Sequence, residues 1–240
     1  MVRTRATLLA AAELQMEASP MNSPSRFSRR LGALGVVFGV LFAAASALVL
    51  GAPSAGASAA RVIAYGNTHF ATATASVFLL MLAAIALVFF LGSLRQALAT
   101  TSELRVIGSI VTVGGAVLAG GMLVQALVIN ALLDVAHYHS AAAAKALLMI
   151  ASNTWIPLVT GLSAVTLGTG VTALRGGGLP RWLAWASIVL GVLAVAGPLG
   201  EVAGPLGLLW AVIVGITLFR SADPAQPTPP VDRATVTAAH

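Results

Sequence analysis

The sequence predicts an all-α fold, a polytopic bundle of transmembrane helices, from its composition and from the length of its apolar stretches. Of its 240 residues, 58% are hydrophobic and only 8% are charged, whereas about a quarter of the residues in soluble domains are charged. Uncharged apolar stretches recur along the chain at about the 20-residue length that crosses a hydrocarbon core roughly 30 Å thick. Helices are the open-ended structure that satisfies its backbone hydrogen bonds in lipid, so we expect each stretch to be helical.

Six such stretches lie in the central part of the chain, residues 31–220, and we expect each to span the membrane once. The expected spans are residues 31–50, 71–94, 106–133, 146–174, 182–197 and 204–219. Residues 1–30 are polar and are expected to form a mostly disordered cytoplasmic extension. Residues 221–240 contain four prolines and no apolar periodicity, which is typical of a disordered tail.

The first span, residues 31–50, has an alternative interpretation as a secretory signal peptide. Ala57 and Ala59 form the small-residue pattern of a cleavage site after it. The apolar core of a signal peptide is about 7 to 15 residues long, and this stretch is longer. We therefore expect it to remain in the protein as a span.

The distribution of basic residues predicts that both termini are cytoplasmic. With the amino terminus inside, most arginines near span ends face the cytoplasm and only Arg61 and Lys145 face outward, as the positive-inside rule requires. The inward set is Arg26, Arg29, Arg30, Arg95, Arg105, Arg175, Arg181, Arg220 and Arg233. Arginines that face anionic headgroups also account for the net charge of +6, and no basic cluster interleaved with aromatic residues indicates nucleic-acid binding. The single lysine among many arginines indicates GC-rich coding and hence a bacterial plasma membrane.

The last two spans are expected to form a hairpin around the sequence GPLGEVAGPLG, residues 197–207. As one helix, residues 182–219 would be roughly 57 Å long, nearly twice the thickness of the hydrocarbon core. Pro198 and Pro205 each remove a backbone donor near the midpoint and disfavour helix in the preceding residue. We therefore expect Glu201 to lie at the outer tip of this hairpin, in water, and not as a functional carboxylate inside the membrane.

The third and fourth spans are longer than the membrane requires. Each would be about 42 Å long, so we expect both to extend beyond the bilayer on the outer side, from near Gln125 in one and near Trp155 in the other. This excess length predicts an outward helical hairpin or a polar vestibule. Pro157 is expected to kink the fourth span and to leave a backbone carbonyl free for a neighbour or for water.

Polar side chains gather on this outer side of the membrane. Asn130, Asp134 and His137 recur at i, i+4 and i+7, so a continuous helix presents them on one face. The candidate polar cluster consists of Asn130, Asp134, His137, His139, Asn153 and His69. A Zn²⁺ or proton-relay site formed by His69, Asp134, His137 and His139 is the alternative. No spacing typical of metal ligands is present, so we expect no metal and no cofactor.

No other motif in the chain indicates catalysis, and the remaining pattern is one of helix packing. The sequence has no cysteine, no phosphate-binding glycine loop and no G-x-S-x-G turn. Small residues recur at helical spacing in the first and last spans. These are Gly35, Gly39, Gly207, Ala211 and Gly215. We expect them to allow close packing inside the bundle, with a homodimer seam as the alternative.

The C-terminal third of the chain carries a resemblance to a known family. The run GLPRWLAWASIVLGVLAVAGPLG, followed by an apolar span that ends in LFR, resembles a family of six-helix actinobacterial-type membrane proteins that form a domain of unknown function. The resemblance is strongest over residues 179–220 and looser over residues 31–174. It implies a six-span architecture and transfers no substrate, cofactor or catalytic residue.

Two classes of function fit these observations. The first is a non-enzymatic bundle in the lipid bilayer that binds a small apolar ligand, a membrane-protein partner or a second copy of itself. The second is a metal-dependent enzyme or an ion-coupled carrier that uses the outer polar cluster. An ion-coupled carrier needs a polar path through the membrane, and the cytoplasmic halves of the spans contain little beyond Ser and Thr. The sequence therefore favours the non-enzymatic class.

Overall fold

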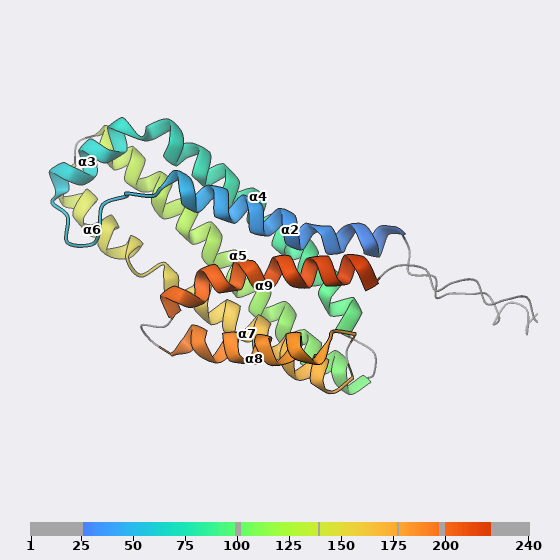
Figure 1. The fold of residues 1–240 in the computed structure, drawn as a ribbon. Coiled ribbons are helices and arrows are strands. Elements are labelled where there is room, and N and C mark those ends of the chain that lie inside the picture. Colours follow the sequence, from blue (N-terminus) through green and yellow to red (C-terminus); the bar gives the residue numbers. More distant parts are fainter. Residues whose placement is uncertain (1–25, 99–101, 139, 177, 197–199, 222–240) are drawn as a thin grey trace, which may run out of the picture.

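The computed structural model describes residues 26–98, 102–138, 140–176, 178–196 and 200–221. Within these ranges the only regular secondary structure is helical, which confirms the predicted all-α class. The helices, labelled in Figure 1, are α2 (Arg26–Leu48), α3 (Ala59–Thr68), α4 (Phe70–Leu98), α5 (Ser102–His137), α6 (Ala141–Ala151), α7 (Trp155–Leu174), α8 (Arg181–Val195) and α9 (Gly200–Ser221).

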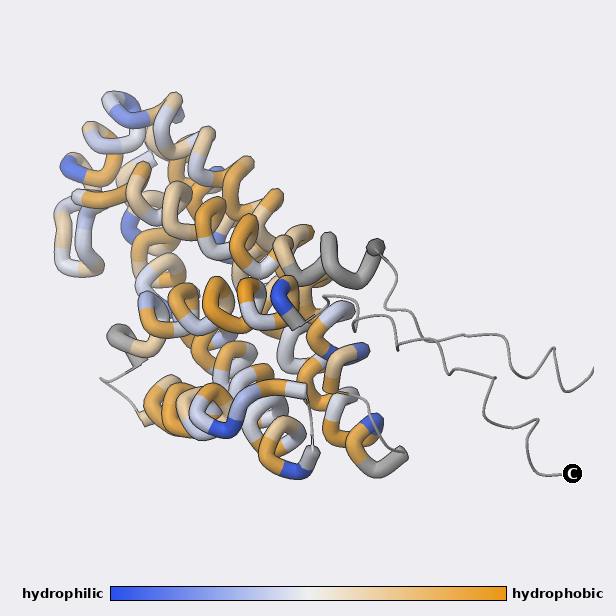
Figure 2. Tube along the Cα trace, turned by 45° about the vertical axis from the view of Figure 1, so that its right-hand side comes forward, coloured by the Kyte–Doolittle hydropathy of each residue, from blue (hydrophilic) through white to orange (hydrophobic). Residues whose placement is uncertain are grey.

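Several of these helical segments are long and apolar enough to cross a membrane. Four such segments are Phe70–Leu98, Leu104–His137, Ala141–Leu174 and Ala203–Arg220, and two shorter apolar helices are Ala33–Leu48 and Arg181–Val195. The protein is therefore a helical, multi-pass integral membrane protein. Figure 2 shows the corresponding pattern, because hydrophilic residues concentrate toward the two ends of the bundle and hydrophobic residues fill the length between them.

The helices pack antiparallel around α5. One side of α5 packs on α4 and the other on α7, while α2 packs on α4 and α9, and α8 packs on α7 (Figure 1). At one end of the bundle this arrangement brings together five exposed arginines. These are Arg95, Arg105, Arg175, Arg181 and Arg220. The opposite end contains α3 and α6, where the basic side chains of the described residues are Arg61 and Lys145. The bundle is thus polarised in charge from end to end.

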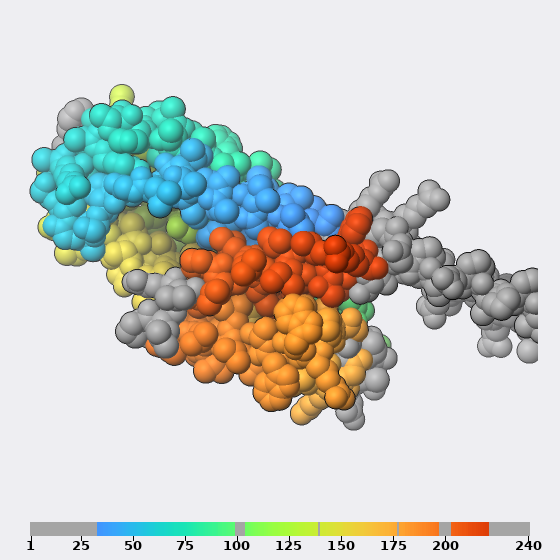
Figure 3. Space-filling view, viewed as in Figure 1, coloured from blue at the N-terminus to red at the C-terminus, as the bar shows by residue number. Residues whose placement is uncertain are grey.

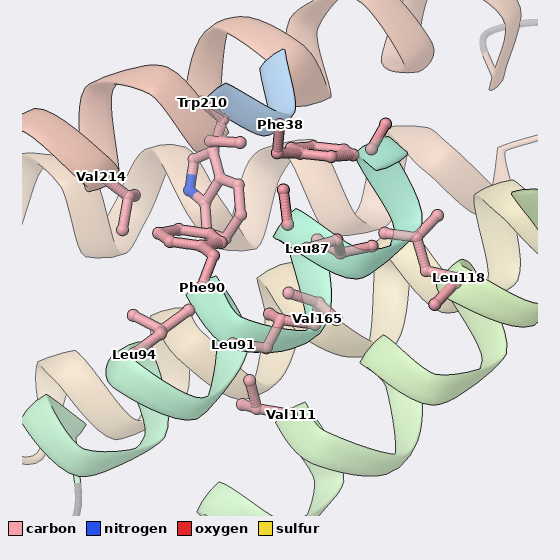
Figure 4. Packing of buried hydrophobic residues seen from close by; sticks show 14 of the residues in the cluster. Phe38, Leu87, Phe90, Leu91, Leu94, Val111, Leu118, Val165, Trp210 and Val214 are labelled. Atoms are coloured by element: carbon pink, nitrogen blue, oxygen red, sulfur yellow. The ribbon is translucent and has the colours of Figure 1, made fainter. Parts of the chain in front are cut away.

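A core of large side chains joins the helices in the middle of the bundle. Phe38 of α2, Phe90 of α4 and Trp210 of α9 are all buried, and Figure 4 shows the Trp210 indole lying next to the Phe90 ring. The indole Nε1–H of Trp210 also donates a hydrogen bond of 2.7 Å to Ser187 Oγ on α8. A buried indole normally requires such a partner for its N–H, so this bond fixes α9 against α8.

Two further hydrogen bonds between helices involve small polar residues. Ser76 Oγ of α4 donates to the Ala45 carbonyl of α2 at 2.9 Å, and Ser163 Oγ of α7 donates to the Gly191 carbonyl of α8 at 2.8 Å. In lipid there is little hydrophobic drive between helices, so close packing and bonds of this kind hold the bundle together.

Small residues allow the first and last membrane helices to approach closely. A Cβ atom added at Gly35 would lie 2.9 Å from the Ala211 carbonyl oxygen, and one added at Gly39 would lie 2.6 Å from Val212 Cγ2. On α9, a Cβ at Gly207 would lie 2.8 Å from Leu162 Cδ2 of α7. Ala211 and Gly215 are also buried. Gly35 and Gly39 therefore let α2 approach α9 closely, and Gly207 lets α9 approach α7.

The predicted fourth span is interrupted before the proline that was expected to kink it. Helix α6 ends at Ala151 and α7 begins at Trp155. The backbone N–H of Asn153 bonds to Ile150 O at 2.9 Å and that of Ile156 to Asn153 O at 3.2 Å, which are bonds to the third preceding residue. Pro157 has no N–H for the Asn153 carbonyl, and its ring would crowd that carbonyl in a continuous helix. The prediction of a free carbonyl was wrong, because the tighter turn gives Asn153 O a donor.

The structure also changes two expected boundaries. Residues 59–68, which lie between the first two expected spans, form α3. Its N-cap residue is Ser58, whose side chain accepts a bond of 3.3 Å from the N–H of Arg61. Helix α9 begins at Gly200, so the backbone of Glu201 lies in its first turn and Pro205 lies inside the helix. The chain does reverse between α8 and α9 (Figure 1). Glu201 belongs to the first turn of α9, and residues 197–199 before it lie outside the described ranges.

Candidate functional site

Three helical segments form a cap over the end of the bundle opposite Arg95, Arg105, Arg175, Arg181 and Arg220. We define the cap as α3, α6 and the last two turns of α5, residues 130–137, all visible together in Figure 1. Val62, Ala144 and Leu148 are buried between these segments, and Leu132 and Val135 of α5 pack on them. The cap thus has a small hydrophobic core of its own, separate from the core of the bundle.

Of the predicted polar cluster, Asn130, Asp134 and His137 lie on the exposed surface of the α5 part of this cap. Asn130 Nδ2 donates to Asp134 Oδ2 at 3.4 Å, and both residues are exposed. The His137 ring lies edge-on to Tyr138, with ring centroids 5.5 Å apart. Asn153 is placed at the α6–α7 turn, where its Nδ2 donates to the Met149 carbonyl at 2.8 Å.

The histidines of the alternative metal site are not gathered by the part of the chain that the structure describes. His69 lies between α3 and α4, where its ring stacks on Tyr65 at 4.3 Å and its Nδ1 lies 2.8 Å from Thr68 Oγ1. Within the described ranges no three His, Asp or Glu side chains lie close enough together to hold a metal ion. His139 falls outside those ranges, so the four-residue metal site stays a prediction.

Beneath the cap lies a cavity of about 310 Å³. It is enclosed by α3, α5 and α6, by the first turn of α4 and by the segment after α2, and most of its wall is apolar, with Val62, Ile129, Leu132 and Leu148 among its lining residues. Its volume is at the lower end of the range of small-molecule sites, which is about 300 to 1,000 Å³. Among the described residues, none that lines it carries a charge.

Two polar side chains in the wall of this cavity lack hydrogen-bond partners. The Tyr65 Oη and Gln125 Oε1 atoms are buried, and neither has a partner among the described residues. The other polar groups behave differently, because Ser152 Oγ donates to Met149 O at 2.7 Å and Thr154 Oγ1 to Ala151 O at 2.8 Å. A buried polar atom without a partner costs about 1 to 3 kcal/mol, and such atoms are rare enough in native proteins to require an explanation.

The surroundings of Tyr65 keep its hydroxyl neutral. Burial raises the pKa of Tyr65 above its ordinary value of 10.0, because the apolar surroundings disfavour the phenolate. The Tyr65 phenol therefore stays protonated at every pH at which an exposed tyrosine is protonated, and also at somewhat higher pH. A neutral phenol both donates and accepts, while the Gln125 Oε1 atom accepts. The two unpartnered side chains thus offer the cavity one donor, the Tyr65 hydroxyl, and two acceptors, the Tyr65 and Gln125 oxygens.

Neither Tyr65 nor Gln125 was singled out from the sequence as a site residue. Tyr65 lies in α3, which the sequence did not predict, so its position over α5 could not be foreseen. Gln125 was recognised as the residue near which the third span leaves the membrane, and an amide within the apolar part of this helix was the available signal. What brings the two together is the packing of α3 on α5.

A second cavity, of about 180 Å³, lies inside the bundle. It is lined by α2, α4, α5, α7 and α9, and its wall includes Phe38, Met122, Leu158 and Gly207. Its only polar side-chain groups are the indoles of Trp155 and Trp210. We refer to the two as the cap cavity and the bundle cavity.

Comparisons with protein-family models, with curated proteins and with solved structures find no match for this chain. The resemblance noted for residues 179–220 therefore stays a prediction, and the geometry of the two cavities is the evidence on function.

Proposed function

We propose that this membrane protein is a non-enzymatic binding protein that holds a small, neutral, amphipathic molecule in the cap cavity. The observation that carries the proposal is the pair of unpartnered buried atoms, Tyr65 Oη and Gln125 Oε1, in a wall that is mostly apolar and carries no charge among the described residues. A ligand with a hydroxyl or amide head would donate to Gln125 Oε1, bond to the Tyr65 hydroxyl and place its hydrocarbon part against the aliphatic wall. Binding would then remove the cost of the unpartnered groups.

The absence of charge in the wall selects the class of ligand. No Arg, Lys, His, Asp or Glu of the described residues lines the cap cavity. An ionised head such as a carboxylate or phosphate would lose its hydration without gaining an ionic partner, which is strongly unfavourable in an apolar site. A neutral head needs only hydrogen bonds, which the wall supplies.

The alternative of an enzyme or ion-coupled carrier lacks comparable support. Asn130, Asp134 and His137, its proposed residues on α5, are exposed on the cap and do not line the cap cavity. The buried threonines of α7, such as Thr166 and Thr169, donate to carbonyls of their own helix at 2.8 and 2.7 Å, so they do not form a polar path between helices.

The proposal includes a topology of six spans in a bacterial plasma membrane, with both termini in the cytoplasm. Support comes from the two shorter helices Ala33–Leu48 and Arg181–Val195, which are apolar and lie beside the longer segments (Figure 1). Further support is the arginine-rich end, which fits a cytoplasmic face. The cap cavity would then open toward the outer leaflet.

A test of this topology uses the absence of cysteine from the chain. Ser140→Cys in the cap and Gly178→Cys in the α7–α8 turn both place a thiol at an exposed position. In intact cells an impermeant maleimide is expected to label the first variant and not the second, and permeabilised cells should label both equally. Labelling of Gly178→Cys in intact cells would show that the orientation is inverted.

Binding of a neutral amphiphile tests the function itself. Protein kept in amphipol is expected to bind tritiated 1-octanol saturably, after subtraction of protein-free particles, and to bind octanoate far more weakly because the carboxylate has no ionic partner. Tyr65→Phe and Gln125→Leu should each weaken 1-octanol binding about three- to tenfold, which is the loss of one hydrogen bond.

Tyr138→Phe is the matched control, since the chain has two tyrosines and Tyr138 is 79% exposed on the cap. Its affinity for 1-octanol should equal that of the wild type. If the Tyr65→Phe, Gln125→Leu and Tyr138→Phe proteins all bind 1-octanol with the same affinity, the ligand head group does not bind in the cap cavity.

A further inference from the structure

The cap cavity and the bundle cavity lie one behind the other along a single face of α5. Leu118 and Met122 line the bundle cavity, and Gln125, Ile129 and Leu132 line the cap cavity. These positions follow one another at intervals of three and four residues, so they form one stripe on the helix. Met122 and Gln125 are separated along the axis by only about 4.5 Å.

Other segments besides α5 also contribute neighbouring residues to both cavities. Thr154 lines the cap cavity and the next residue, Trp155, lines the bundle cavity. On the opposite side, Phe42 of α2 lines the bundle cavity and Val49, at the end of α2, lines the cap cavity. Figure 3 shows the yellow surface of α6 set back between α2 and the outer end of α9, on the side where the α6–α7 interruption lies.

Met122 is the side chain of the α5 stripe at the junction between the cavities. It is fully buried and is the only flexible, unbranched side chain among those that line the bundle cavity. Methionine changes rotamer readily and adapts to the shape of a neighbour. A movement of this one side chain would therefore connect the two spaces without a change in the helices.

We propose that the natural ligand is a long, single-chain neutral lipid whose chain continues past Met122 into the bundle cavity. This inference rests on the proposed function, in which the head group bonds to Tyr65 and Gln125. The bundle cavity suits hydrocarbon alone. Its polar side-chain groups among the described residues are two indoles, those of Trp210 and Trp155. The Trp210 N–H is already bonded to Ser187, and Trp155 is exposed. The stripe from Leu118 to Leu132 is about 21 Å long, which is the length of a lipid chain and far longer than 1-octanol.

A variant that fills only the bundle cavity separates this inference from the proposed function. Val159 of α7 lines the bundle cavity and is partly buried, so Val159→Phe would place a ring there. Affinities of 1-octanol and 1-hexadecanol for the protein in amphipol are the measured quantities. Burial of each additional methylene strengthens binding about fourfold, so exclusion of the chain should weaken 1-hexadecanol binding about tenfold or more and leave 1-octanol binding unchanged. Val192→Phe on α8 is the control, because Val192 is 54% exposed and lines neither cavity.

The outcomes distinguish the two proposals. Loss of 1-hexadecanol binding in Val159→Phe, with 1-octanol binding intact, supports a chain that enters the bundle. Unchanged binding of both probes would overturn that inference and leave the cap site in place, whereas failure of the wild type to bind 1-octanol would overturn the proposed function.

A second measurement on the wild type covers the case in which Val159→Phe does not fold. A 1-hexadecanol analogue with a diazirine at the chain end is expected to cross-link to Leu118, Met122 or Leu158 in the bundle cavity. Cross-links confined to lipid-facing residues such as Leu123 and Leu127, which are exposed on α5, would show that the chain lies outside the bundle.

Discussion

Replacement of Gly161 by alanine is expected to destabilise the bundle by about 2 to 3 kcal/mol, the upper part of the usual range for overpacking. A Cβ atom at this position would lie 2.5 Å from the backbone nitrogen of Leu118 and 2.7 Å from its Cα. Backbone atoms in the middle of a helix cannot turn aside as a long side chain can. Helices α5 and α7 would have to separate, which would weaken the most extensive helix pairing in the bundle.

Gly120→Ala provides the matched control for this effect. Gly120 lies on the same pair of helices, and a Cβ added there would have no atom within 4 Å. Since alanine favours helix over glycine by about 1 kcal/mol, this variant should be as stable as the wild type or slightly more stable. Unfolding in mixed micelles followed by circular dichroism measures both changes. A Gly161→Ala protein as stable as Gly120→Ala would mean that α5 and α7 are not in the close contact described above.

Removal of the Trp210 side chain should cost about 3 to 5 kcal/mol, the range for truncation of a large buried aromatic residue. Trp210 is 6% exposed and is packed against Phe90 in the middle of the core (Figure 4). Its indole also bonds to Ser187 Oγ at 2.7 Å. Trp210→Ala would therefore leave a cavity and lose the bond that fixes α9 against α8. Unfolding of the purified protein, again followed by circular dichroism, gives the free-energy change.

Two companion variants separate the packing of Trp210 from its hydrogen bond. Trp210→Phe keeps most of the ring and loses the bond, while Ser187 Oγ keeps its donation to the Leu183 carbonyl at 2.7 Å, so the expected cost is about 1 kcal/mol. Trp185→Ala removes an indole of α8 that is 59% exposed and should change stability by about 0.5 kcal/mol or less. Equal effects of Trp210→Ala and Trp185→Ala would contradict the position of Trp210 in the core.

The two core variants also bear on ligand binding, because both touch the bundle cavity. Leu118, which Gly161→Ala would displace, and Trp210 line that cavity. Trp210→Ala would enlarge the cavity by nearly the volume of an indole. If a lipid chain occupies this space, the ligand should restore part of the stability lost in Trp210→Ala, since a ligand that binds only the folded state stabilises it by mass action.

The sequence by itself determined the class of the protein and the positions of its apolar helices. Hydrophobic length and the placement of charges are local properties, and lipid requires each apolar segment to satisfy its own backbone as a helix. The expected apolar stretches therefore fall largely on α2, α4, α5, α7, α8 and α9, although the fourth is interrupted between α6 and α7. Arg95, Arg105, Arg175, Arg181 and Arg220 gather at one end of the bundle. The errors lie where the local pattern is ambiguous. Helix α3 has too few apolar residues to be recognised from the sequence. Pro157 was expected to kink a continuous helix, but the helix is interrupted at the turn before it, between α6 and α7.

Only the tertiary structure decided what the protein could bind. The sequence directed attention to Asp134 and His137, because charged residues in an apolar chain are conspicuous, yet these side chains lie on the outer surface of the cap. Tyr65 and Gln125 both line the cap cavity, the proposed binding site, because α3 packs on α5, and both polar atoms lack partners among the described residues. A cavity is the space that side chains from distant segments fail to fill. Its existence depends on how those segments pack, and no periodicity within a single segment records it.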